Sequence, residues 1–223
     1  MDIFKRKGKE QETYVLRRGL SRKKHSMIWD LLLFSGLVLL VFWGFFFWNV
    51  QTALNEFDQG NYAGCLKKLS RVSFLTPLDA GLHYKMALAQ ARLGHHQEVI
   101  DICRKILAMH PSEFPQVSSG LPRPSLTEVY LGLAIAHMAL EQYGDVIAYA
   151  QLILTQVGDD AIAYKLLADA HFKRSFFRKE YAGLRAARKF FARAYELNLN
   201  VLTQEDWVMM RALRDDPMSQ NFQ

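Results

Sequence analysis

Residues 83–111 read HYKMALAQARLGHHQEVIDICRKILAMHP, in which two apolar-periodic segments flank a turn at Gly94 and a proline closes the unit. The same punctuation recurs at a spacing of 34 residues, since Gly60 precedes Gly94 and Pro77 precedes Pro111 by that distance. A 34-residue period with a turn glycine in mid-unit and a proline at its end is typical of stacked helical hairpins. Such arrays present extended concave surfaces, so the period favours a protein that binds other proteins.

Three units of this kind can be read between residues 80 and 200. Their first segments are His83-x2-Met86-Ala87-x2-Gln90, Tyr130-x2-Leu133-Ala134-x2-His137 and Tyr164-x2-Leu167-Ala168-x2-His171. Their second segments are Val99-x3-Cys103, Val146-x3-Ala150 and Ala187-x3-Phe191. We expect turns at Gly94 and at residues 142–145. The recurring alanines are predicted to lie where the helices of a unit cross closely, because larger side chains would separate them.

The segment from Asn49 to Leu199 resembles the tetratricopeptide repeat (TPR) family, and the resemblance covers about two-thirds of the chain. It implies an α-solenoid whose hairpins stack because a single hairpin cannot bury its apolar face alone. Several signature positions of the family are replaced in this sequence. Two replacements, His137 and His171, occupy equivalent helix positions, which favours packing over a metal-binding pair.

We therefore predict an all-α fold, with one N-terminal transmembrane helix that continues into about four TPR-like helical hairpins and a C-terminal capping helix. The predicted parts are a basic cytoplasmic segment (1–26), a transmembrane helix (27–49), a helical repeat domain (50–200), and a capping helix with a tail (201–223). Residues 112–124, rich in Pro, Ser and Gly, add 13 residues to the period and are predicted to form a loop. The last hairpin gains seven residues, and Thr203 and Asp206 are expected to open the capping helix as a capping box.

The apolar run from Leu31 to Trp48 (LLLFSGLVLLVFWGFFFW) carries no charge. Its 18 residues span roughly 27 Å as a helix, close to the thickness of a bilayer core. No Gly or Pro separates Phe45 from Phe57, so one continuous helix is expected to cross the bilayer and open the first hairpin, holding the repeat domain at a fixed angle. A cleaved signal peptide fits less well, because the charged segment in front is 30 residues long and no clean small-x-small site follows.

The distribution of charge on either side of the apolar run predicts the orientation of the chain in the membrane. Residues 1–30 have a net charge of +5, whereas the remainder of the chain carries +1 of the total +6. The positive-inside rule places the N-terminus in the cytoplasm and the repeats on the far side, which in a bacterium is the periplasm. The pI of about 9.3 is thus a topogenic and lipid-surface signal, and no nucleic-acid partner is expected. Mitochondrial-type anchoring, with the repeats in the cytosol, stays open as an alternative.

The first helices of successive units are expected to line a concave groove. An apolar trough with a basic end suits a partner's amphipathic helix or extended segment that carries acidic residues. Filling of part of this face by the 112–124 loop or by the C-terminal helix is the alternative. The predicted groove residues are Tyr84, Leu88, Arg92, Leu131, Ile135, Met138, Lys165, Asp169 and Phe172.

A second candidate surface is basic. Residues 173–193 contain eight basic residues and one acid, a balance suited to an acidic protein or an anionic lipid or wall polymer, although a solvated face is the ordinary meaning of such a stripe. This basic face consists of Lys173, Arg174, Arg178, Arg185, Lys189 and Arg193.

No catalytic, phosphate-binding or metal-binding motif is found, so we expect neither enzyme activity nor a cofactor nor a metal. Cys65 and Cys103 fall at apolar repeat positions and are predicted to be buried thiols rather than a bridge. The sequence favours a membrane-anchored scaffold or assembly factor in an envelope complex, with membrane or envelope subunits as partners. A periplasmic chaperone-like factor that binds translocated clients through the same groove is the alternative.

Overall fold

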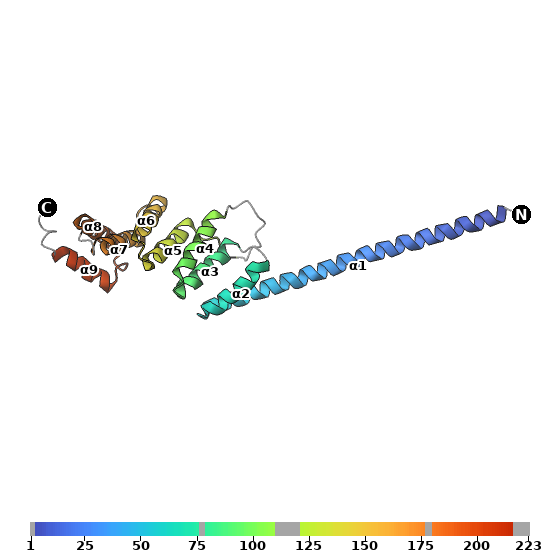
Figure 1. Cartoon of the computed structure of the whole chain (residues 1–223), viewed down its shortest axis with the longest axis horizontal. Helices are drawn as coiled ribbons and strands as arrows, with labels where there is room; N and C mark the ends of the chain where they lie inside the picture. The colour runs from blue at the N-terminus through green and yellow to red at the C-terminus, as the bar shows by residue number, and fades with distance from the viewer. Residues whose placement is uncertain (1–2, 76–78, 110–120, 177–179, 216–223) are drawn as a thin grey trace. The chain divides into compact units, whose positions relative to one another are not determined.

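A computed structural model of the chain describes the backbone of residues 3–75, 79–109, 121–176 and 180–215, and the side chains of residues 29–73, 79–109, 121–176 and 180–213. This part of the chain is all-α (Figure 1). Its helices are α1 (Ile3–Asp58), α2 (Tyr62–Leu75), α3 (Ala80–Arg92), α4 (His96–Ala108), α5 (Leu126–Ala139), α6 (Tyr143–Val157), α7 (Ala161–Phe176), α8 (Tyr181–Leu197) and α9 (Gln204–Asp215). They form two compact units, Met1–Asn49 and Val50–Gln223.

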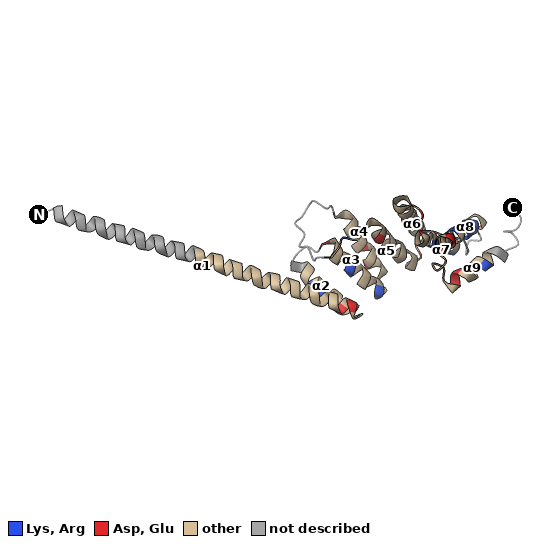
Figure 2. Ribbon diagram, turned by 180° about the vertical axis from the view of Figure 1, so that it is seen from behind, with Lys and Arg blue, Asp and Glu red and all other residues tan. Residues whose placement is uncertain are grey.

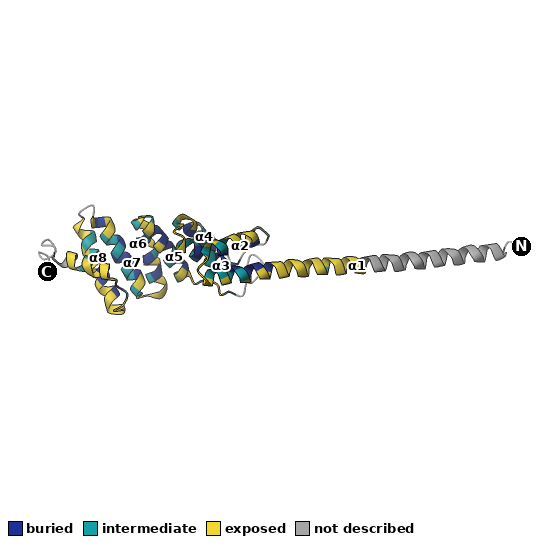
Figure 3. Ribbon diagram, turned by 90° about the horizontal axis from the view of Figure 1, so that it is seen from below, coloured by how far each residue is buried: buried dark blue, intermediate teal, exposed yellow. Residues whose placement is uncertain are grey.

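The first unit consists of the N-terminal part of α1. The prediction of one continuous helix is confirmed, because α1 runs unbroken from Ile3 to Asp58. The segment Trp29–Asp58 is long and apolar enough to cross a membrane. Its large apolar side chains from Leu31 to Val41 are exposed, as the yellow part of α1 in Figure 3 shows. An exposed apolar helix near the N-terminus is compatible with a membrane anchor and with a signal sequence.

The second unit is a row of helical hairpins. The end of α1 is joined to α2 by the ion pair of Glu56 with Lys68, and the pairs α3–α4, α5–α6 and α7–α8 follow. Each helix from α2 onward packs on the next. The first hairpin is held by the edge-to-face contact of Phe57 with Tyr62. The recurring alanines of the first helices, Ala87, Ala134 and Ala168, are buried as predicted. The predicted all-α array of four hairpins is therefore confirmed for the described residues.

The turns inside the first three hairpins share one backbone feature. Gly60 and Gly94 adopt φ values of 80° and 79°, in the left-handed region that glycine enters without strain. The third hairpin places Glu141 there, at φ 59°. The expectation of a turn at residues 142–145 was wrong by a few residues, because α6 begins at Tyr143 and Gly144 lies inside it. The glycine that seemed to mark this turn is a helix residue, and a glutamate makes the turn.

We expect Glu141→Gly to raise the free energy of unfolding by about 0.5–1 kcal/mol, because the left-handed conformation costs a non-glycine residue about 1–2 kcal/mol, part of which the greater chain entropy of glycine offsets. The reciprocal change, Gly94→Glu, should destabilise the protein, because a non-glycine residue is strained in the left-handed conformation. No atom lies within 4 Å of the new Cβ, so the loss reports backbone strain without a steric clash. Urea unfolding of both variants measures this pair. Equal effects of the same sign would contradict the assignment of strain to the turn.

The C-terminal elements close the row. The last hairpin is longer than the second, as predicted, with helices of 16 and 17 residues against 13 and 13. The predicted capping box is confirmed: the Thr203 backbone N–H donates to the Asp206 carboxylate at 2.6 Å, and the Asp206 N–H donates to Thr203 Oγ1 at 3.4 Å. In the predicted 112–124 loop, residues 121–124 are non-helical, and residues 112–120 lie outside the described part of the chain, as do Pro77 and Pro111.

Candidate functional site

The first helices of the hairpins, α3, α5 and α7, carry the predicted groove residues. Contacts run from α3 to α5 and from α5 to α7, so these helices form one face of the second unit. Three of the nine predicted residues, Tyr84, Leu88 and Ile135, lie together around a pocket. The remaining six divide between the end of α3, the seam that joins α5 to α7 and the region where α9 packs.

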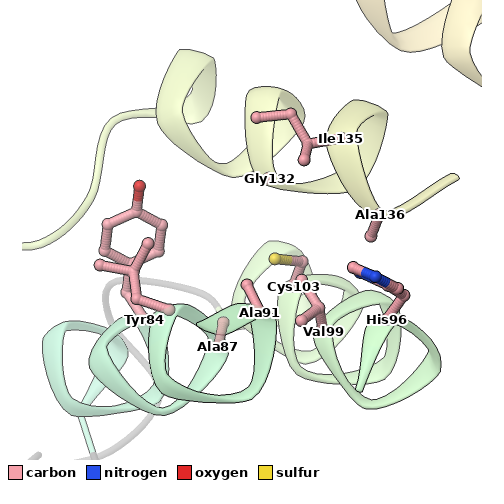
Figure 4. Close-up of a pocket in the computed structure, with 10 residues that line it drawn as sticks. Tyr84, Ala87, Ala91, His96, Val99, Cys103, Gly132, Ile135 and Ala136 are labelled. Atoms are coloured by element: carbon pink, nitrogen blue, oxygen red, sulfur yellow. The ribbon is translucent and has the colours of Figure 1, made fainter. Parts of the chain in front are cut away.

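The pocket lies at the seam where α3 and α4 meet α5, and its volume is about 80 Å³. Figure 4 shows α5 above it and α3 and α4 below it. The surface that lines it is apolar, and Ile135, at its edge, is 49% exposed. The lining residues are Tyr84, Ala87, Leu88 and Ala91 of α3, His96, Val99 and Cys103 of α4, and Gly132, Ile135 and Ala136 of α5.

Two further predicted residues, Leu131 and Met138, lie at the next seam. Both are partly buried and pack against the cluster that joins α5 and α6 to α7, which contains Leu166. Arg92, at the end of α3, is exposed and lies outside the pocket. Leu131 and Met138 therefore contribute mainly to the core, and Ile135 is the predicted α5 residue that is half exposed.

The α7 end of the predicted groove is covered by the chain itself. Lys165 Nζ lies 2.9 Å from Asp169 Oδ2 and 3.1 Å from Oδ2 of Asp206 in α9, and Asp206 is buried. Phe172 packs against the cluster that includes Leu213 of α9. Helix α9 thus neutralises Lys165, and the basic end that the sequence suggested is an internal ion-pair network.

Burial sets the protonation chemistry of this network. Burial raises the pKa of Asp169 above its usual range, and the hydrogen bond and charge of Lys165 oppose that shift. Burial lowers the pKa of Lys165, but the hydrogen bond and charge of Asp169, with a further contribution from Asp206, outweigh it and leave that pKa raised. Lys165 is therefore charged at neutral pH, and its ion pair with Asp206 links α7 to α9.

The predicted basic face lies mainly on α8, whose cations are blue in Figure 2. Its members Lys173, Arg174, Arg185 and Lys189 are exposed, and Arg178 lies outside the described residues. Arg193 forms ion pairs with Asp159 and Glu196. A hydrogen bond from Tyr164, followed by the one from Arg193, lowers the pKa of Asp159. Arg193 is thus already paired within the chain.

The equivalent histidines pack, as the sequence predicted. His137 stacks on Tyr149 and His171 packs against Phe190, each with ring centroids 5.5 Å apart. Cys65 and Cys103 are free and buried, and burial raises the pKa of each thiol to about 11. Among the described side chains, no three His, Cys, Asp or Glu residues are grouped as a metal site would require.

Sequence reasoning missed most of the pocket. Ala91, His96 and Gly132 line it, and none was among the predicted groove residues. One signal was available: Gly132 stands in the interior of a segment that otherwise favours a helix. A glycine at such a position commonly has a packing or functional reason. Alignment of the units would have placed this glycine opposite α3.

The hairpins, their order and the capping helix define a TPR-like α-solenoid, a fold typical of protein-interaction scaffolds and typically non-enzymatic. No protein-family model and no curated protein sequence matches the chain.

Solved structures share the fold at low sequence identity. A MamA RS-1 ArsTM double mutant superposes with a TM-score of 0.50 at 17% identity, over 78% of this chain and 94% of that one. MamA 41-end from Desulfovibrio magneticus RS-1 gives 0.49 at 16% identity, over 78% and 95%. TTC0263, a thermophilic TPR protein in Thermus thermophilus, gives 0.42 at 16% identity, over 77% and 92%. Identities this low show a common fold alone.

Proposed function

We propose that this protein is a membrane-anchored TPR-like scaffold or assembly factor that holds a partner protein, another subunit of a membrane or envelope complex, in the groove of its repeats. The N-terminus is in the cytoplasm, the apolar part of α1 crosses the bilayer, and the repeats lie on the far side, which in a bacterium is the periplasm. The charge difference across the span supports this orientation. The combination of one apolar N-terminal helix with a repeat array supports the proposed role in an envelope complex.

One observation carries the proposal: an apolar pocket opens between the first helices of successive hairpins, beside the half-exposed Ile135. Apolar surface of this kind is costly to leave in water, and concave apolar sites are where proteins and ligands commonly bind. A partner segment that lies across the α3–α5 seam would cover it. The α7 end of the same face is already covered by α9, so the open part of the groove is limited to α3 and α5.

The membrane part of the proposal rests on the exposed apolar stretch of α1. An uncharged helical segment of 18 residues in contact with water would be strongly unfavourable, whereas a bilayer solvates it. A retained anchor predicts that the intact chain, including residues 1–30, stays in membranes that have been washed with alkaline carbonate. A signal sequence predicts a shortened chain in the soluble fraction.

The experiment that tests the scaffold is capture of partners from such membranes with tagged full-length protein in mild detergent. Ile135→Glu should reduce recovery of a single dominant, stoichiometric partner by about tenfold or more, because a carboxylate would have to be desolvated in an apolar contact. Leu152→Glu is the matched control, since Leu152 is 40% exposed but lies on α6, outside the pocket. It should leave recovery unchanged.

Each other outcome has a definite meaning. A heterogeneous, substoichiometric set of proteins would support the chaperone-like alternative in place of the scaffold. A single partner that Ile135→Glu retains, but that the double change Arg185→Glu with Lys189→Glu loses, would move the interface to the basic face. A partner that neither variant loses would exclude both surfaces.

A further inference from the structure

The pocket at the α3–α5 seam has a filled counterpart one step along the array. Residues of α3 and α4 correspond to residues of α5 and α6 at a spacing of 47, as Cys103 does to Ala150. Residues of α5 correspond to residues of α7 at a spacing of 34, as His137 does to His171. The α3–α5 and α5–α7 seams can therefore be compared position by position.

Most pocket positions have a counterpart in the core cluster of the next seam. Ala87, Val99 and Cys103 correspond to Ala134, Val146 and Ala150, which are all buried there. Three positions, Ala91, His96 and Gly132, carry smaller residues than their counterparts, whereas Tyr84 and Cys103 are larger than Leu131 and Ala150. Gly132 stands where α7 has Leu166, and Ala91 stands where α5 has Met138. Leu166 is only 8% exposed and packs among those same small residues.

The largest difference in side-chain size among these positions is that between Gly132 and Leu166. A Cβ at Gly132 would meet only Cys103 Sγ, at an ordinary contact distance of 3.5 Å, so packing does not demand glycine at this position. Glycine also weakens a helix interior relative to alanine. The seam thus forgoes both helix stability and the contacts that its neighbour gains from Leu166.

We infer that the pocket receives one aliphatic side chain of leucine or methionine size from the protein partner. The next seam supplies the evidence for this chemistry, because the equivalent space there is occupied by Leu166 and bordered by Met138. The pocket is lined by apolar atoms, so an aliphatic group fits it and a charged group does not. This inference rests on the proposed function, and it specifies which feature of the partner is recognised.

The test fills the pocket from within. Gly132→Leu reproduces the residue of the next seam, and we expect it to reduce partner recovery by about tenfold or more, since a buried leucine contributes on that scale to affinity. Its melting temperature should be no lower than that of the natural chain. Gly132→Ala is the matched control: it removes the helix-weakening glycine, leaves most of the space, and should retain the partner.

The two claims fail separately in this design. If Ile135→Glu leaves the partner bound, the proposed groove is wrong. If Ile135→Glu loses the partner and Gly132→Leu keeps it, the groove stands and the pocket inference is overturned. The dominant partner must be the same identified chain in every comparison, so that recovery of unrelated proteins does not count.

A second measurement needs no partner. Apolar cavities in proteins bind xenon, so methyl NMR of the full chain in a lipid nanodisc can follow a xenon titration. We expect a saturable shift of the Ile135 δ1 methyl, which the Gly132→Leu variant abolishes. Ile162, 47% exposed on α7 and outside the pocket, is the reference. An Ile135 shift no larger than that of Ile162 would show that the pocket is closed and would overturn the inference.

Discussion

Replacing Phe191 with alanine is expected to lower the free energy of unfolding of the last hairpin by about 4 kcal/mol. Phe191 is wholly buried in α8 and belongs to the cluster that joins α7, α8 and α9. Its buried neighbours in that cluster include three alanines, which cannot move far enough to fill the space that a phenylalanine leaves. The lost transfer free energy and the remaining cavity therefore add.

Hydrogen exchange of the full chain is the measurement suited to this change, because hairpin arrays open locally and each hairpin contacts chiefly its neighbours. Amides of α7, α8 and α9 should lose protection, while those of α3 and α4 should keep it. Phe176→Ala is the control, since Phe176 is 55% exposed and should cost less than about 1 kcal/mol. Equal loss of protection along the whole array would contradict a local role for Phe191.

The second large effect is expected at Lys165. Lys165→Met should destabilise the protein by about 2–3 kcal/mol, because it leaves the carboxylates of Asp169 and Asp206 facing one another in a largely buried site. Urea unfolding, followed by circular dichroism, measures this loss. The partial exposure of the lysine side chain, 21%, places the expected value below that of a fully buried pair.

This loss should depend on pH with a definite sign. A carboxyl whose pKa is raised on folding favours the folded state below its unfolded pKa, and this contribution is lost as the pH rises through the folded pKa. Burial already raises the pKa of Asp169, and removing Lys165 should raise it further. The variant should therefore lose less stability at pH 5 than at pH 8. A loss that is larger at pH 5 would contradict this account.

A paired substitution separates charge from packing. Lys165 and Asp169 stand where the preceding first helix has Leu131 and Ile135. Lys165→Leu combined with Asp169→Ile should therefore be less destabilising than Lys165→Met alone, because only Asp206 remains charged and Thr203 still donates to it. If the double change lowers the free energy of unfolding more than Lys165→Met does, the network stabilises the protein through packing and not through charge balance.

Much of this fold follows from periodicity. The spacing of Ala87, Ala134 and Ala168 predicted the helix crossings, because the requirement for a small residue at a close approach is local and visible in one sequence. The continuity of α1 likewise followed from the absence of a helix breaker. The turn at Glu141 was misplaced because a nearby glycine, Gly144, gave the stronger local signal, although its φ is not positive.

The candidate site was less predictable, because it depends on contacts between residues far apart in the chain. Lys165 and Asp206 are 41 residues apart, and no spacing rule relates a groove lysine to a residue of the capping helix. The pocket depends on the missing side chain at Gly132; the sequence showed a glycine in a helix interior but not the space that it leaves beside α3 and α4. Ile135 was identified in advance because alignment of the repeat units places it on the face that the first helices share.

The buried thiol at the pocket has a practical consequence. Because burial raises the pKa of Cys103 to about 11, the thiol is almost wholly protonated at neutral pH, and only the thiolate reacts with alkylating reagents. Alkylation of Cys103 therefore has to wait until the α3–α5 seam separates and water reaches the sulfur. The rate at which Cys103 is alkylated therefore measures how often the second and third hairpins separate.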